Sequence, residues 1–162
     1  MRKLRTFAPL IVIFLIIVLA SLGVMAFFDA WRMGIFMRFF MGFFFVIFGS
    51  LKFYDLQGFV NAYREYDIIA QRSQPYAVAY PFIELALGMS YLVNFSILIT
   101  LVATFAIMSV SVLGVFIALR NKQQLQCACV GTFFKLPMTT VTLVEDVLMA
   151  GMALWTLVMI FI

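Results

Sequence analysis

Long, unbroken hydrophobic runs separated by short polar segments make up most of the chain. A helix needs about 20 consecutive apolar residues to cross a bilayer, and these runs reach that length. The run over residues 80–119 would extend about 60 Å as a single helix, twice the thickness of the hydrocarbon layer, so it must turn back. Asn94 and Ser96 form the only polar break near its middle. We therefore predict five membrane-spanning helices. Their expected ranges are residues 7–28, 33–54, 76–93, 96–119 and 137–162.

The composition agrees with this pattern. Hydrophobic residues make up 66% of the chain and charged residues 11%, with a mean hydropathy of +1.15. A soluble domain of this size carries about 25% charged residues. Because the apolar runs are continuous rather than alternating, helices are favoured over a β-barrel. We predict an all-α integral membrane protein whose partner is the lipid bilayer, and the net charge of +4 indicates membrane topology, not nucleic-acid binding.

The first helix has two interpretations. Residues 7–28 follow a basic start, and Val24-Met25-Ala26 resembles a weak signal-peptide cleavage site. The apolar part of a signal peptide is about 7–15 residues long, so this run fits a retained anchor better. We expect an anchor helix over residues 1–31 and a separate core over residues 32–162.

The positive residues indicate the orientation. With five spans and an N-terminus in the cytoplasm, nine Lys and Arg residues fall on the inner side, and Arg32 and Arg38 fall on the outer side. Cytoplasmic loops are enriched in Lys and Arg, so this arrangement fits the rule. We expect a bacterial inner-membrane protein with its C-terminus outside. The nine inner residues are Arg2, Lys3, Arg5, Lys52, Arg64, Arg72, Arg120, Lys122 and Lys135.

Polar residues follow single faces of the predicted helices. On the second span two cations and three glycines lie within about 80° of one another, and such a face should point into a bundle. For Arg38, snorkelling to the membrane surface is an equally open interpretation. The segment 55–74 is either a short amphipathic helix at the interface or a loop. The aligned residues are Gly34, Arg38, Gly42, Gly49 and Lys52 on the second span, Pro81, Glu84, Gly88 and Tyr91 on the third, and Ser96, Thr100, Thr104 and Ser111 on the fourth.

Ionisable residues converge at one end of the predicted bundle. Lys52 ends the second span, Glu84 lies just inside the third, and Glu145 and Asp146 lie about 12–14 Å inside the fifth. Ionisable residues inside the membrane are costly and usually functional. The alternative is a structural ion pair that fixes the helix register. We take Lys52, Glu84 and Asp146 as candidate site residues.

Both cysteines lie in the loop beside this cluster, as Cys127-Ala-Cys129. Zinc needs four donors, and the chain has no histidine, so a zinc site is disfavoured. Copper(I) accepts fewer thiolates and stays open as an alternative, as does a plain structural turn. Nearby Lys122 and Lys135, and the positive end of the helix predicted to start at Pro137, favour a thiolate. We therefore expect Cys127 and Cys129 to form a redox pair.

The ordered set of short motifs resembles the MauE family of DoxX-like membrane proteins over about residues 32–162. Each motif is short, but their order and spacing together are fairly specific. The chain departs from the family pattern by its additional first helix and by Val130 between the second cysteine and the glycine. The matching stretches are Phe48-Gly49-Ser-Leu-Lys52, Asp55 with Gly58-Phe59, Tyr66-Asp67, Pro81-Phe-Ile-Glu84-Leu-Ala-Leu-Gly88, Cys127-Ala-Cys129-Val-Gly131 and Leu143-Val-Glu145-Asp146.

This resemblance implies a four-helix membrane core associated with thiol–disulfide redox chemistry. MauE proteins are linked to the maturation of a disulfide-rich periplasmic enzyme, and distant relatives to quinone-linked sulfur oxidation. Two functions follow as expectations. The first is a thiol–disulfide oxidoreductase that serves a thioredoxin-like or client protein and uses quinone as electron acceptor. The second is a non-enzymatic membrane subunit that acts as a scaffold.

Overall fold

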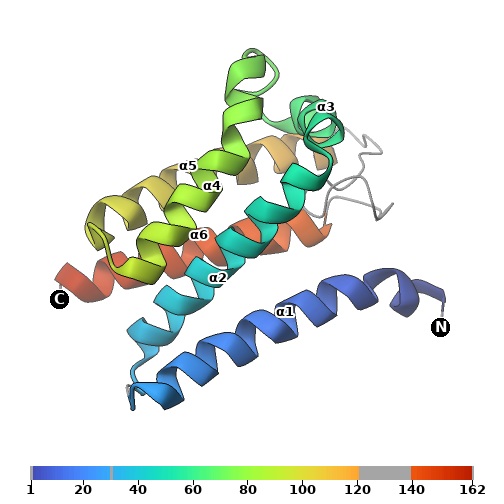
Figure 1. Ribbon diagram of the computed structural model, residues 1–162. Helices are drawn as coiled ribbons and strands as arrows, with labels where there is room; N and C mark the ends of the chain where they lie inside the picture. The colour runs from blue at the N-terminus through green and yellow to red at the C-terminus, as the bar shows by residue number, and fades with distance from the viewer. Residues whose placement is uncertain (1, 30, 121–139, 162) are drawn as a thin grey trace.

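The computed structural model describes residues 2–29, 31–120 and 140–161 of the chain. In these ranges the secondary structure is entirely helical, with turns between the helices and no strand. Figure 1 shows their arrangement. The helices are α1 (Arg2–Phe27), α2 (Met33–Tyr54), α3 (Leu56–Tyr66), α4 (Gln74–Val93), α5 (Ile97–Arg120) and α6 (Thr140–Phe161).

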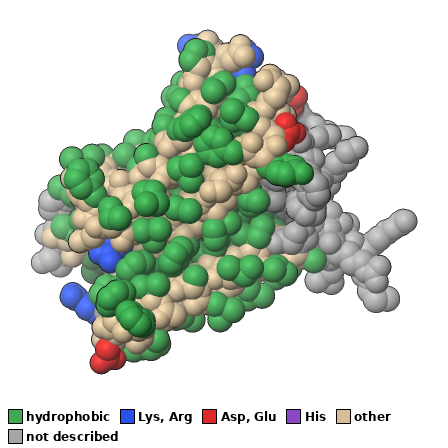
Figure 2. Space-filling view, in the orientation of Figure 1, with side chains coloured by type: hydrophobic (Ala, Val, Ile, Leu, Met, Phe, Trp, Pro, Cys, Tyr) green, Lys and Arg blue, Asp and Glu red, His purple; other side chains and the backbone are tan. Residues whose placement is uncertain are grey.

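Five of these helices, all except α3, are long and apolar enough to cross a membrane. Their backbone hydrogen bonds are satisfied within each helix, which is what a lipid environment requires. Large apolar side chains such as Leu19, Ile99 and Phe116 are exposed along the bundle, and hydrophobic side chains cover much of the face in Figure 2. The prediction of an all-α integral membrane protein is confirmed.

Four helices form a bundle, and α1 lies along its outside. Helix α2 packs mainly against α4, and α5 packs mainly against α6, while α1 packs along α2 (Figure 1). Ile17, Ser21 and Met25 form the buried face of α1. The fold is therefore a four-helix membrane bundle with an additional N-terminal helix. The division into an anchor and a separate core stays a prediction.

Helices α2 and α4 approach closely because glycines lie at their contact. Gly88 of α4 faces the backbone of Val46 and Gly42 on α2, so that a methyl group there would lie 2.9 Å from the Val46 amide nitrogen. Gly49 similarly faces Leu85 of α4. Small residues at such positions let membrane helices pack backbone to backbone.

The polar break between the third and fourth spans forms the predicted turn. Asn94 ends α4 with a left-handed backbone (φ 58°), and Ser96 adopts φ 43° before α5 begins. Asn is among the residues that tolerate this conformation best. The chain therefore reverses within a few residues, as expected. Ser96 itself is exposed, so the prediction that it shares the buried face of Thr100 was wrong, because the turn lies at the end of the bundle.

Helix α3 closes one end of the bundle, which resolves the choice between helix and loop for this segment. Asp55 accepts a hydrogen bond from the Gly58 amide at its start (2.9 Å). After its end, the Asp67 carboxylate accepts from the amides of Ile69 (3.0 Å) and Ala70 (2.8 Å). The inner face of α3 is apolar and aromatic, so the helix packs onto the bundle instead of lying apart at the membrane surface. Its buried residues are Phe59, Val60, Tyr63 and Tyr66.

The expected inward face of α2 is only partly correct. Gly42, Gly49 and Lys52 are buried, but Gly34 is exposed and Arg38 is half-buried. The difference arises because the first turns of α2 extend beyond the part of α4 on which the glycines pack. The expected helix start at Pro137 and both cysteines lie outside the described residues.

The close approach of α2 and α4 makes Gly88→Ala a test of the packing. The added methyl group would meet backbone atoms, which cannot move aside cheaply, so we expect a loss of about 1–3 kcal/mol in unfolding free energy. Gly151→Ala on α6 is the matched control, since nothing lies within 4 Å of the added methyl group. Unfolding in detergent should separate the two variants, and equal stability would contradict the packing described.

Candidate functional site

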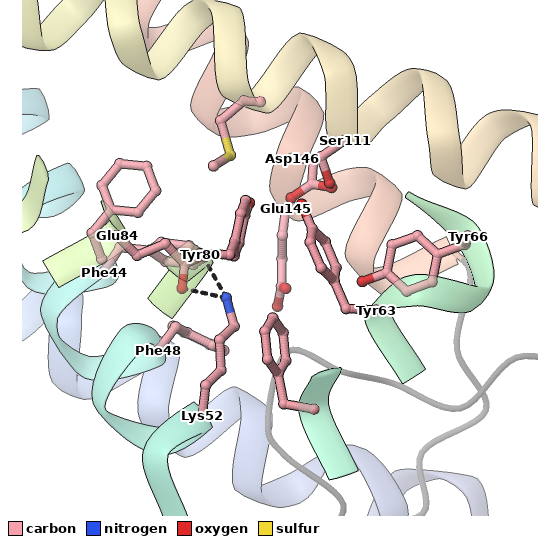
Figure 3. Close-up of a pocket in the computed structure, with 13 residues that line it drawn as sticks. Phe44, Phe48, Lys52, Tyr63, Tyr66, Tyr80, Glu84, Ser111, Glu145 and Asp146 are labelled. Atoms are coloured by element: carbon pink, nitrogen blue, oxygen red, sulfur yellow. Dashed lines mark hydrogen bonds and ion pairs between the residues drawn. The ribbon is translucent and has the colours of Figure 1, made fainter. Parts of the chain in front are cut away.

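Lys52 and Glu84 form an ion pair inside the bundle. Lys52 lies in the last turn of α2 and Glu84 lies in the middle of α4, and they are only 5% and 4% exposed. The Lys52 ammonium donates hydrogen bonds to both carboxylate oxygens of Glu84 (Figure 3). The partner that the sequence predicted for Lys52 is therefore present.

Aromatic rings enclose the same ammonium. The Lys52 Nζ atom lies 5.3 Å from the centre of the Phe59 ring and 5.0 Å from that of Tyr80. The negative face of an aromatic ring attracts a cation, and this attraction grows when water is excluded. Phe59 comes from α3 and Tyr80 from α4, so three helices meet at this one charge.

Two acidic residues of α6 line the same cavity. Ser111 of α5 donates a hydrogen bond to Oδ2 of Asp146 (2.6 Å). Glu145 is buried, and in Figure 3 its side chain points toward the region between Lys52 and Tyr63. Three carboxyl groups and one ammonium group are therefore gathered in one space between α2, α4, α5 and α6.

Stacked aromatic rings form the wall on the α3 side. The rings of Tyr63 and Tyr80 lie 4.5 Å apart, and those of Phe59 and Tyr63 lie 5.2 Å apart. Burial raises the pKa of the Tyr63 phenol well above its usual value, with smaller contributions from neighbouring groups such as Tyr80. The phenol is thus neutral at physiological pH, and the wall screens the ionisable groups without adding a charge.

The enclosed space is small. The cavity holds about 20 Å³, which suffices for about one water molecule. It is too small for the ring of a quinone unless the wall moves. Such a space suits the transfer of protons between fixed side chains better than the binding of an organic molecule. Its lining residues are Phe44, Phe45, Phe48, Lys52, Phe59, Tyr63, Tyr66, Tyr80, Glu84, Met108, Ser111, Glu145 and Asp146.

Three of the five candidate site residues meet in this cavity: Lys52, Glu84 and Asp146. The other two, Cys127 and Cys129, lie outside the described residues, so their redox and copper roles stay predictions. Within the described ranges, no group of three Asp, Glu, Cys or His side chains could hold a metal ion.

Tyr80 was not among the predicted site residues, although the sequence contained a signal for it. Tyr80 precedes Glu84 by one helical turn, and residues four apart share a face of a helix. An aromatic residue at that position would therefore have been expected beside the charge.

The ion pair predicts strong coupling between Lys52→Met and Glu84→Gln. Each single change leaves a buried group without its partner and should cost about 3–5 kcal/mol in unfolding free energy. The double variant should lose clearly less than the sum of the two. Lys52→Met combined with Glu65→Gln is the control. Glu65 is exposed, so the losses in unfolding free energy of these two changes should add. Additivity in both pairs would mean that the ion pair does not contribute to stability.

The comparison with known families extends over this whole core. The family model described as methylamine utilisation protein MauE matches residues 32–159, from the start of α2 nearly to the end of α6. No curated protein and no solved structure matches the chain significantly. The match includes every helix that lines the cavity and covers most of the sequence. The chain therefore belongs to the MauE family.

Proposed function

We propose that this membrane protein is a thiol–disulfide redox protein that supports the maturation of a partner protein or supplies it with electrons. The cysteine pair Cys127 and Cys129 is the proposed reactive group. The observation that carries the proposal is the cluster of Lys52, Glu84, Glu145 and Asp146, which lines the cavity at the end of the bundle where α5 ends and α6 begins.

Chain length supports a connection between the cysteines and this cluster. Cys127 follows the last residue of α5, Arg120, by seven positions, and an extended chain spans at most about 3.6 Å per residue. The thiol is therefore tethered within about 25 Å of Arg120. Gly114, less than two turns before that residue, already contacts the backbone of Tyr66, whose ring lines the cavity.

The proposed reaction is a balanced exchange of two electrons. A thiolate of the pair attacks a disulfide of a thioredoxin-like partner and forms a mixed disulfide, which the second cysteine resolves. The partner leaves as a dithiol, and Cys127 and Cys129 form a disulfide. In the reverse direction the pair oxidises a partner dithiol. A one-residue spacer makes a strained ring, which favours a transient disulfide over a structural one.

Quinone is the proposed acceptor when the pair is reoxidised. Two thiols lose two electrons and two protons and form the disulfide. The quinone takes up the two electrons and the two protons and becomes the quinol. In this proposal Glu84 and Asp146 move the protons, and Lys52 balances the changing charge. The cavity is suited to this role because its polar groups are held in fixed positions by the helices that line it.

A non-enzymatic scaffold is the second candidate function. The Lys52–Glu84 pair joins α2 to α4, and such pairs can serve only to fix the helix register. In that case the bundle would be a docking surface for other membrane subunits. Copper(I) binding by the same two cysteines would be a third use, and the experiments below separate the three.

The redox proposal predicts that the cysteine pair cycles in membranes. A maleimide reagent should add two labels after reduction and none after incubation with a soluble quinone. Cys127→Ser should add one label under both conditions and should lose activity toward the partner. The double variant Cys127→Ser/Cys129→Ser is the unlabelled control. Full function of Cys127→Ser would favour the scaffold, and protection from label by copper(I) alone would favour copper handling.

The proposed orientation places the cysteine loop in the cytoplasm and the C-terminus outside. It rests on the bias of nine to two in the positive residues. A membrane-impermeant maleimide should then label inverted vesicles of the bacterial inner membrane but not intact cells. Labelling of intact cells would overturn the orientation and would bring the cysteines to the periplasmic side.

A further inference from the structure

A second, larger cavity lies at the opposite end of the bundle, between the start of α2 and the end of α6. Its volume is about 560 Å³, which falls in the range of small-molecule binding sites. The Lys52 cavity lies at the other end of α2 and shares none of its lining residues. The lining residues are Arg32, Met33, Gly34, Ile35, Met37, Arg38, Trp155, Thr156, Met159 and Ile160.

The charge of this cavity is positive. Arg32 and Arg38 both line it, and none of the lining residues that the structure describes is acidic. The other Lys and Arg residues of the described chain belong to the opposite half of the bundle. Arg32 and Arg38 are therefore the only described Lys or Arg residues at this end. The positive end of the α2 dipole, at Met33, lies in the same wall and also favours an anion.

Arg38 is held in a way that suggests a missing partner. Its Nε atom is buried and makes no hydrogen bond, which is costly for a charged donor. The guanidinium group lies 4.6 Å from the centre of the Phe39 ring, which fixes its position without neutralising its charge. A planar guanidinium is suited to binding the oxygens of phosphate or carboxylate through two parallel hydrogen bonds.

Apart from Thr156 and Gly34, the remaining lining is apolar and opens on the flank of the bundle that faces lipid. Met33, Trp155, Met159 and Ile160 are all exposed large apolar side chains. Trp is enriched at the level of lipid head groups, where its ring is partly in the apolar phase and partly hydrated. Arg38 lies five residues after the start of α2, about 8 Å along the helix axis, which is near that level. A bound molecule here would have an anionic head and an apolar tail.

We propose that Arg32 and Arg38 bind the phosphate head group of an anionic phospholipid in this cavity. A free phosphate ion would leave the apolar part of the wall uncovered. A neutral quinone would leave two permanent cations without a counter-charge. This site is separate from the redox proposal and does not depend on it.

Native mass spectrometry of the full chain in detergent tests the proposal, with phosphatidylglycerol and phosphatidylcholine as probes. We expect one phosphatidylglycerol to bind more tightly than phosphatidylcholine. Arg38→Gln should weaken its binding at least about tenfold, as expected for loss of a charged hydrogen bond. Arg38→Lys keeps the charge but not the planar group and should lose less. Arg72→Gln is the matched control, because Arg72 is exposed at the other end of the bundle.

Gly34→Phe provides a second variant that keeps both arginines. Gly34 lines the cavity, and nothing lies within 4 Å of a methyl group added there, so a larger side chain would begin in open space beside the cavity. We expect this variant to fold and to lose the bound phosphatidylglycerol, while Gly151→Phe on α6 should keep it. Retention of the lipid by both Arg38→Gln and Gly34→Phe would overturn the proposal. Displacement of the lipid by excess inorganic phosphate would overturn it in favour of a free anion.

Discussion

A lysine ammonium that enters a helix bundle loses its hydration shell, and Lys52 recovers that energy only from groups that neighbouring helices bring to it. Glu84 supplies the opposite charge from α4, and the rings of Phe59 and Tyr80 supply weaker attraction. Each contact requires a particular distance between helices. The glycines at the contact of α2 and α4 provide that distance, because bulkier side chains would hold the two backbones apart.

The same requirement accounts for α3. This short helix is too polar to cross a membrane, yet its inner face carries Phe59 and Tyr63, which cover the ion pair. Asp55 and Asp67 fix its two ends by accepting backbone hydrogen bonds. Because the helix is anchored at both ends, its aromatic face forms a defined wall on that side of the cavity.

The sequence predicted the spans well, because the length of an apolar run and the thickness of the bilayer determine them almost alone. The turn at Asn94 was predictable for the same reason. Contacts between helices were harder to predict from the sequence. Helical spacing placed Lys52 and Arg38 on one face of α2, but it could not show that α4 lies beside only one of them. Whether Arg38 enters the bundle depends on where α4 ends relative to α2, and periodicity within α2 contains no information about that.

Helix α2 thus carries two cations that differ in their counter-charges. Lys52 and Arg38 are fourteen residues apart, about 21 Å along the helix, so one ligand head group cannot contact both. The counter-ion of Lys52 is part of the chain, because Glu84 of α4 pairs with it inside the bundle. Arg38 and Arg32 share a cavity that contains no carboxylate, and an arginine does not lose its proton to relieve the cost. None of the described residues that line this cavity supplies a counter-charge, and in our proposal the head group of an anionic lipid provides it.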